Sequence, residues 1–146
     1  MGKLNNLLAG LAGAIALNIL HEGIRKKDQG APRVDLLGEE ALQKTLSYFG
    51  TGIKNENTLY GATLAGDIIS NTLYYSVIGA GNAKYLWPKA IFMGLSAGIG
   101  ATKLPKPIGL DPEPVAETSK KQVLTVGYYL IGAIVTAMVV KSLNNK

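Results

Sequence analysis

The chain has 146 residues, which suits one domain over 1–146, and it carries a formal net charge of +5. Only 17% of the residues are charged, below the roughly 25% usual in soluble globular proteins. There is no cysteine and His21 is the single histidine, so disulfides, thiolate catalysis and multi-histidine metal sites are excluded. We therefore expect neither a metal ion nor a cofactor.

Four apolar segments divide the chain. Each is about 17–20 residues long, close to the length of a helix that crosses a bilayer core. They predict helices over about 4–22, 58–79, 86–103 and 120–142, separated by polar connections. The sequence therefore predicts an all-α, polytopic membrane protein in which four transmembrane helices form one antiparallel bundle.

The connections between these segments differ in character. The first predicts a short amphipathic helix over about 34–49, because leucines and Phe49 recur on one face opposite charged side chains. Such a helix can lie on the membrane surface or cover the bundle. The third connection contains four prolines and predicts an extended spacer. It ends at Ser119 and Gln122, whose spacing is that of a capping box for the fourth helix.

Basic residues gather at the ends of the apolar segments. This pattern favours anionic lipid head groups as the partner and argues against nucleic acid. Ten Lys and Arg residues lie in the first and third connections, and five lie at the opposite end of the predicted bundle. Because cytoplasmic loops are enriched in Lys and Arg, we expect both connections in the cytoplasm and both termini on the opposite side of the membrane.

Small residues recur at four-residue spacing along the apolar segments. In the third segment Ala90, Gly94, Gly98 and Thr102 form one row. Lipid provides no hydrophobic drive for helices to associate, so such rows matter because they let helix backbones approach closely. They predict tight packing inside the bundle, most of all by the third helix, and the alternative is a contact between copies in a homo-oligomer.

Asp67 is the most informative polar residue, because it lies about eight residues into the second segment and hence roughly 12 Å deep. An aspartate at that depth costs about 2.5–3.5 kcal/mol and should face the bundle interior or a watery cavity. The candidate intramembrane polar network consists of Asp67, Asn71, Thr63, Ser96, Tyr128 and Tyr129. It is either a transport or proton-relay path around a protonatable carboxylate, or a set of hydrogen bonds that fixes the second helix in the bundle.

A second candidate site lies at the membrane interface, where the first apolar segment ends in His21 and Glu22. Neighbouring residues on a helix point in different directions, so this pair does not form one metal-binding unit, and Glu22 has Lys26 one turn further on. We expect a solvated helix end, roughly 10 Å nearer the surface than Asp67. The alternative is a cavity mouth or a metal-assisted lipid site. The candidate interfacial residues are Asn18, His21, Glu22, Arg25 and Asp35.

The chain lacks the phosphate-loop motif G-x-x-x-x-G-K-[ST] and the nucleophile elbow G-x-S-x-G. The leading hypothesis is a small, non-enzymatic integral membrane protein that moves a small solute, ion or proton through a polar interior centred on Asp67. One alternative is a structural or accessory membrane subunit that docks a partner or lipid. The other is a lipid-modifying membrane enzyme with an interfacial site near His21 and Glu22.

Overall fold

The computed structural model describes residues 2–145, which form helices and no strands. The helices are α1 (Lys3–Lys27), α2 (Val34–Tyr48), α3 (Glu56–Ser76), α4 (Leu86–Lys103), α5 (Glu113–Ala116) and α6 (Ser119–Asn144). Two short 3₁₀ turns, Val77–Gly79 and Ala83–Tyr85, join α3 to α4. The predicted all-α class is confirmed, and α1, α3, α4 and α6 occupy the four apolar segments, with α2 in the first connection.

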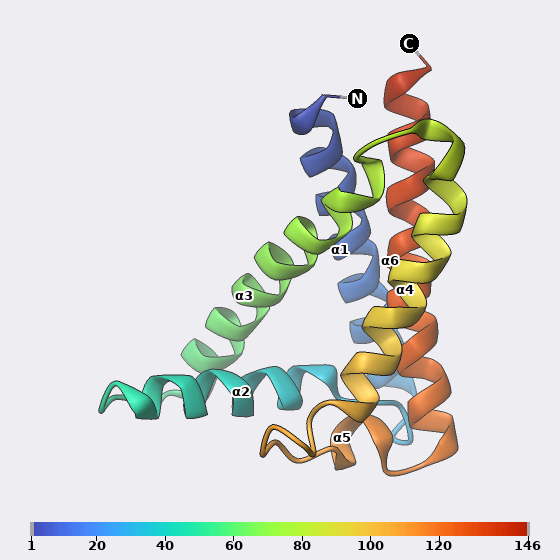
Figure 1. Cartoon of the computed structure of the whole chain (residues 1–146). Helices are drawn as coiled ribbons and strands as arrows, with labels where there is room; N and C mark the ends of the chain where they lie inside the picture. The colour runs from blue at the N-terminus through green and yellow to red at the C-terminus, as the bar shows by residue number, and fades with distance from the viewer. Residues whose placement is uncertain (1, 146) are drawn as a thin grey trace.

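The long helices alternate in direction along the chain (Figure 1). α1 packs against α3 and α6, and α6 packs against α4. α2 crosses the end of the bundle where α1 ends, whereas the start of α1 and the end of α6 lie together at the opposite end (Figure 1). α3 leans away from the other long helices as it approaches α2 (Figure 1). This tilt positions the candidate site described below.

Glycines set the closest contacts of α6 with its neighbours. A Cβ atom on Gly13 of α1 would overlap Thr136 Oγ1 and would lie 2.5 Å from the Gly132 carbonyl oxygen. A Cβ atom on Gly98 of α4 would lie 2.5 Å from Val126 Cα. The small residues of α1 and α4 therefore allow these helices to pack against α6 within one chain.

The contact between α1 and α3 is close only in the second half of α3. There a Cβ atom on Gly10 would overlap the Thr72 carbonyl oxygen. In the first half of α3, Gly61 and Gly66 have open space where a Cβ atom would be. The small residues of α3 therefore do not all serve packing within the chain, and α3 diverges from α1 along its length.

α2 contacts the diverging half of α3 through Gly38. A Cβ atom on Gly38 would lie 2.7 Å from Thr63 Cγ2 and 3.5 Å from Asp67 Oδ1. A residue without a Cβ atom therefore permits this close approach. As a consequence, the start of α2 lies against the face of α3 that carries Asp67.

Two details of the third connection differ from the sequence-based expectations. It is not an extended spacer, because it contains α5 and a turn in which the Leu110 N–H donates to the Pro105 carbonyl oxygen at 2.8 Å. Proline suits turns as well as extended chain, so its abundance did not distinguish them. The N-cap of α6 is Thr118 and not Ser119, since the Thr118 hydroxyl accepts from the Lys121 N–H at 3.1 Å.

Within residues 2–145, two helices are long and apolar enough to cross a membrane: α1 and α6, with mean hydropathies of 1.6 and 2.1 in their most apolar windows. α3 is less apolar because it carries Asp67 and other polar residues, and α4 because it carries Lys89 and Lys103. Large apolar side chains nevertheless point outward, including Ile69 of α3 at 61% exposure and Phe92 of α4 at 71%. The outer surface of the bundle is thus apolar in places on α3 and α4 as well.

Candidate functional site

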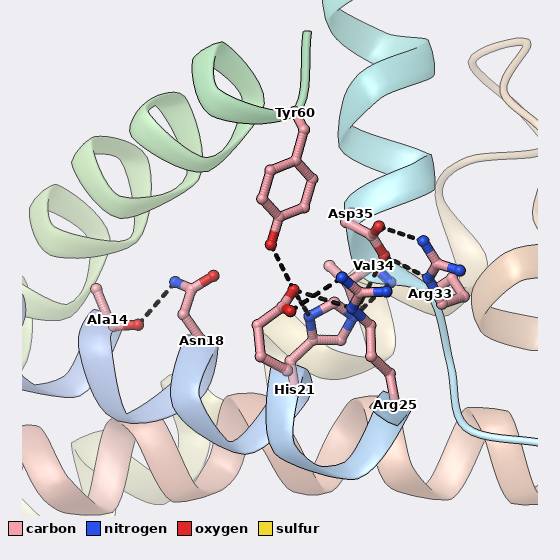
Figure 2. Close-up of polar contacts among 9 residues, drawn as sticks. Ala14, Asn18, His21, Arg25, Arg33, Val34, Asp35 and Tyr60 are labelled. Atoms are coloured by element: carbon pink, nitrogen blue, oxygen red, sulfur yellow. Dashed lines mark hydrogen bonds and ion pairs between the residues drawn. The ribbon is translucent and has the colours of Figure 1, made fainter. Parts of the chain in front are cut away.

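Polar side chains from α1, α2 and α3 meet where α2 crosses the end of α1 (Figure 2). We call this group the polar cluster, and it consists of Asn18, His21, Glu22, Arg25, Arg33, Asp35 and Tyr60. It contains all five residues of the predicted interfacial set. Arg33 and Tyr60 are additional, and the sequence pattern gave no signal for Tyr60 because its partner lies on another helix.

His21 lies inside the polar cluster and is only 3% exposed. Its Nε2 accepts a hydrogen bond from the Val34 N–H at 3.2 Å and lies 3.4 Å from Asp35 Oδ1. Its ring packs edge-on against Tyr128, with ring centroids 6.0 Å apart. The expectation of a solvated helix end is therefore wrong for His21, because α2 covers this end of α1.

The bond from Val34 has a chemical consequence for His21. Since Nε2 accepts, neutral His21 carries its proton on Nδ1, which lies 3.7 Å from Glu22 Oε1. If Nε2 gained a proton, it would lose the Val34 bond and face the Asp35 carboxylate instead. Each ring nitrogen of His21 thus has a carboxylate oxygen within 4 Å.

Asp35 is 7% exposed and forms a two-point contact with Arg33. Arg33 Nε donates to Oδ1 at 2.9 Å and Nη2 donates to Oδ2 at 2.6 Å. Burial by itself raises the pKa of the Asp35 carboxyl, but the two hydrogen bonds from Arg33 and its positive charge hold that pKa well below its ordinary value. Asp35 is therefore ionised at neutral pH and compensates the charge of Arg33.

Glu22 joins α1 to the start of α3. Its Oε1 accepts from the Tyr60 hydroxyl at 2.6 Å and from Arg25 Nε at 3.0 Å. The long Tyr60 side chain thus reaches back to α1 where the two helices have separated (Figure 2). The expected partner of Glu22 was Lys26, but Arg25 on the same helix forms the ion pair instead.

Three cavities follow one another at this end of the protein. An open polar cavity of about 430 Å³ is lined by both arginines of the polar cluster. A narrow cavity of about 10 Å³, room for one water molecule, lies among His21 and Glu22. A third cavity of about 470 Å³, mostly apolar and open, lies between α2, α3, α4 and α6. Asp35 and Tyr60 line the first two cavities, and Asp67 lines the last two.

Val34 and Asp67 line both the narrow polar cavity and the large apolar one, and of these two residues only Asp67 has a polar side chain. Ser96 and Tyr129, which belong to the predicted intramembrane network, line the large cavity with it. In the described part of the chain, Asp67 has no hydrogen-bond or ion-pair partner. Its carboxylate is consequently available to a proton, to water or to a ligand.

The other members of the predicted network occupy different places. Thr63 and Asn71 line the narrow cavity together with Asp67. Tyr128 lines neither of the two cavities that Asp67 lines, and its ring packs against His21. His21 and Asp67, which were expected at separate depths, line the same narrow cavity, because the start of α2 contacts both of them.

No group of three His, Cys, Asp or Glu side chains suited to a metal ion occurs within residues 2–145. His21, Glu22 and Asp35 are instead held by hydrogen bonds and ion pairs with other side chains and with the backbone. The chain matches no protein-family model, no curated protein and no solved structure.

Proposed function

We propose that this chain is a four-span membrane protein that carries protons to and from Asp67 through the seam between α1 and α3. In this proposal α1, α3, α4 and α6 span the bilayer and α2 lies at its surface, on the cytoplasmic side. The 21 residues of α3 and the 18 residues of α4 correspond to about 31 Å and about 27 Å of helix, close to the bilayer core. Their outward apolar side chains support the same placement.

The observation that carries the proposal is the position of Asp67 between two cavities. A proton from solution meets first the open polar cavity and then the narrow cavity that His21 and Asp67 both line. One water molecule in that narrow cavity would connect the polar cluster to Asp67. Ionisable side chains inside membrane proteins mark proton and ion paths because their cost in lipid is high.

Two further buried polar groups lie near the end of α3 and the start of α1, and the Asn6 oxygen faces Gly79 in the turn after α3. Thr72 Oγ1 and Asn6 Oδ1 are buried and have no hydrogen-bond partner among residues 2–145. Thr72 belongs to α3 where it passes Gly10, and Asn6 lies one turn before Gly10 on α1. Buried polar atoms of this kind are normally satisfied, so water that reaches them would supply their partners.

Proton uptake by vesicles tests this proposal. Purified protein is placed in phosphatidylcholine vesicles that contain the pH dye pyranine, and a potassium diffusion potential is set with valinomycin. We expect proton uptake that rises with the amount of protein, and we expect Asp67→Asn to reduce it to the rate of protein-free vesicles. Glu113→Gln, at an exposed acid of α5, is the matched control and should retain the full rate.

The proposal fails if Asp67→Asn conducts protons as fast as the unchanged protein while both elute as single species of the same size. It fails equally if no vesicle containing protein exceeds the protein-free rate.

A lipid-modifying site at His21 and Glu22 has less support, because the bonds to Val34 and Tyr60 already occupy His21 Nε2 and Glu22 Oε1. A role as an accessory subunit remains a prediction from the sequence.

A further inference from the structure

We propose that the large cavity binds an amphipathic amine, with the cationic head group at Asp67 and the apolar body between α2 and α4. This inference rests on the proposed role of Asp67, and it names the class of solute that would exchange with the proton there. The solute competes with the proton because both bind the same carboxylate.

The size and lining of the cavity suit an apolar body. Its volume of about 470 Å³ lies within the range of roughly 300–1,000 Å³ typical of small-molecule sites. Leu37 of α2, Ala97 of α4 and Leu104 after α4 are among its apolar lining residues. Gly100 and Ala101 add only small groups to the α4 side, so α2 and α4 can face each other across a slot.

The charge of the cavity selects the head group. Of the described residues that line it, Asp67 alone carries a formal charge. An unpaired carboxylate in an apolar setting is costly, and a cation beside it removes much of that cost, whereas an anion would be repelled. The hydroxyl groups of Ser96 and Tyr129 line the same cavity and can accept hydrogen bonds. An ammonium group, with three donors and no acceptor, matches this set of acceptors.

Binding can be measured with three fluorescent probes that share one dansyl group and differ only at the end of a five-carbon chain. Dansylcadaverine ends in an amine, dansyl hexylamide ends in a methyl group, and dansyl-6-aminohexanoate ends in a carboxylate. The protein is placed in phosphatidylcholine nanodiscs, with empty nanodiscs as the blank. At pH 8 we expect saturable binding of the amine, at least about tenfold tighter than the methyl and carboxylate probes.

Two variants separate the charge from the shape of the cavity. Asp67→Asn should weaken binding of the amine about tenfold or more and leave the methyl probe unchanged. Ala97→Phe keeps the carboxylate but fills the slot, so it should weaken binding of both probes alike. Lowering the pH should weaken binding of the amine in the unchanged protein and not in Asp67→Asn, because only the former has a carboxylate for which protons compete.

The inference is overturned if the amine binds no better than its methyl analogue, if it binds empty nanodiscs equally well, or if Asp67→Asn retains full affinity. Circular dichroism and size-exclusion chromatography test whether each variant is folded. The variant Asp67→Glu keeps the negative charge and should therefore still bind the amine more tightly than the methyl probe. Failure of amine binding together with Asp67-dependent proton uptake would remove this inference and leave the proposed function intact. Amine binding without proton uptake would remove the proposed function and leave the binding site.

Discussion

Replacing Gly13 by alanine is expected to destabilise the bundle by about 1–3 kcal/mol, the usual cost of overpacking a close contact. The new methyl group would overlap Thr136 Oγ1 and meet the Gly132 carbonyl oxygen, so α1 and α6 would have to separate. Side-chain rotation cannot relieve this contact, because one of the two atoms belongs to the backbone. Thermal unfolding of the detergent-solubilised protein, followed by circular dichroism, measures the loss.

Gly23 provides the control on the same helix. It also lies in α1, but nothing lies within 4 Å of its Cβ position. Gly23→Ala should therefore leave the midpoint of unfolding unchanged or raise it, because alanine favours the helix by up to about 1 kcal/mol. If both alanine variants unfold at the same temperature, the close contact between α1 and α6 is not present in the protein.

The second large effect is expected for Asp35→Asn, which removes the carboxylate from the polar cluster. Arg33 would lose its two-point contact and His21 would lose its acidic neighbour. Removing one partner of a buried ion pair costs about 3–5 kcal/mol, but the Arg33 side chain is 37% exposed, so we expect about 1–3 kcal/mol. Chemical denaturation at pH 7 measures this loss in the free energy of unfolding. The control is Glu39→Gln, because Glu39 is an acid of α2 that forms no ion pair among residues 2–145, and this variant should change the free energy of unfolding very little.

The same variant should change the dependence of stability on pH. Because the pKa of Asp35 is lower in the folded than in the unfolded protein, its contribution is fully present above its unfolded pKa of about 3.9. The contribution is lost as the pH falls from there toward the folded pKa. The difference between the unchanged protein and Asp35→Asn should therefore shrink between pH 6 and pH 3, values we choose to bracket about 3.9. A difference that stays constant over this range would contradict the ion pair.

The helices were predictable because they depend on local sequence. The length of an apolar segment and the polar residues that bound it determine where a helix begins and ends, and the predicted range 86–103 coincides with α4. The choice between Ser119 and Thr118 as N-cap was not predictable in the same way, since both are good caps at adjacent positions. The turns in the third connection were not predicted, because proline is compatible with both an extended chain and a turn.

The polar cluster could be predicted only in part, because it depends on where α2 packs. The sequence showed that His21, Glu22 and Asp35 were candidates, and it placed Asp67 on a polar face of the next apolar helix. It did not show that Gly38 lets α2 pack against α3, which covers His21 and brings it to the same cavity as Asp67. That contact joins residues far apart in the chain, and no periodicity within one helix reveals it.

The proposal requires that Asp67 faces water-filled space, and the absence of cysteine from the chain allows a clean measurement through the large open cavity that Asp67 lines. Single variants Asp67→Cys, Ile69→Cys and Glu113→Cys are placed in nanodiscs and exposed to a membrane-impermeant cationic thiosulfonate reagent. A thiol must ionise in water to react. Ile69 lies on the apolar outer surface, whereas Glu113 is an exposed residue of α5. We predict that Asp67→Cys reacts much faster than Ile69→Cys and approaches Glu113→Cys. Reaction of Asp67→Cys no faster than Ile69→Cys would contradict a hydrated path to Asp67.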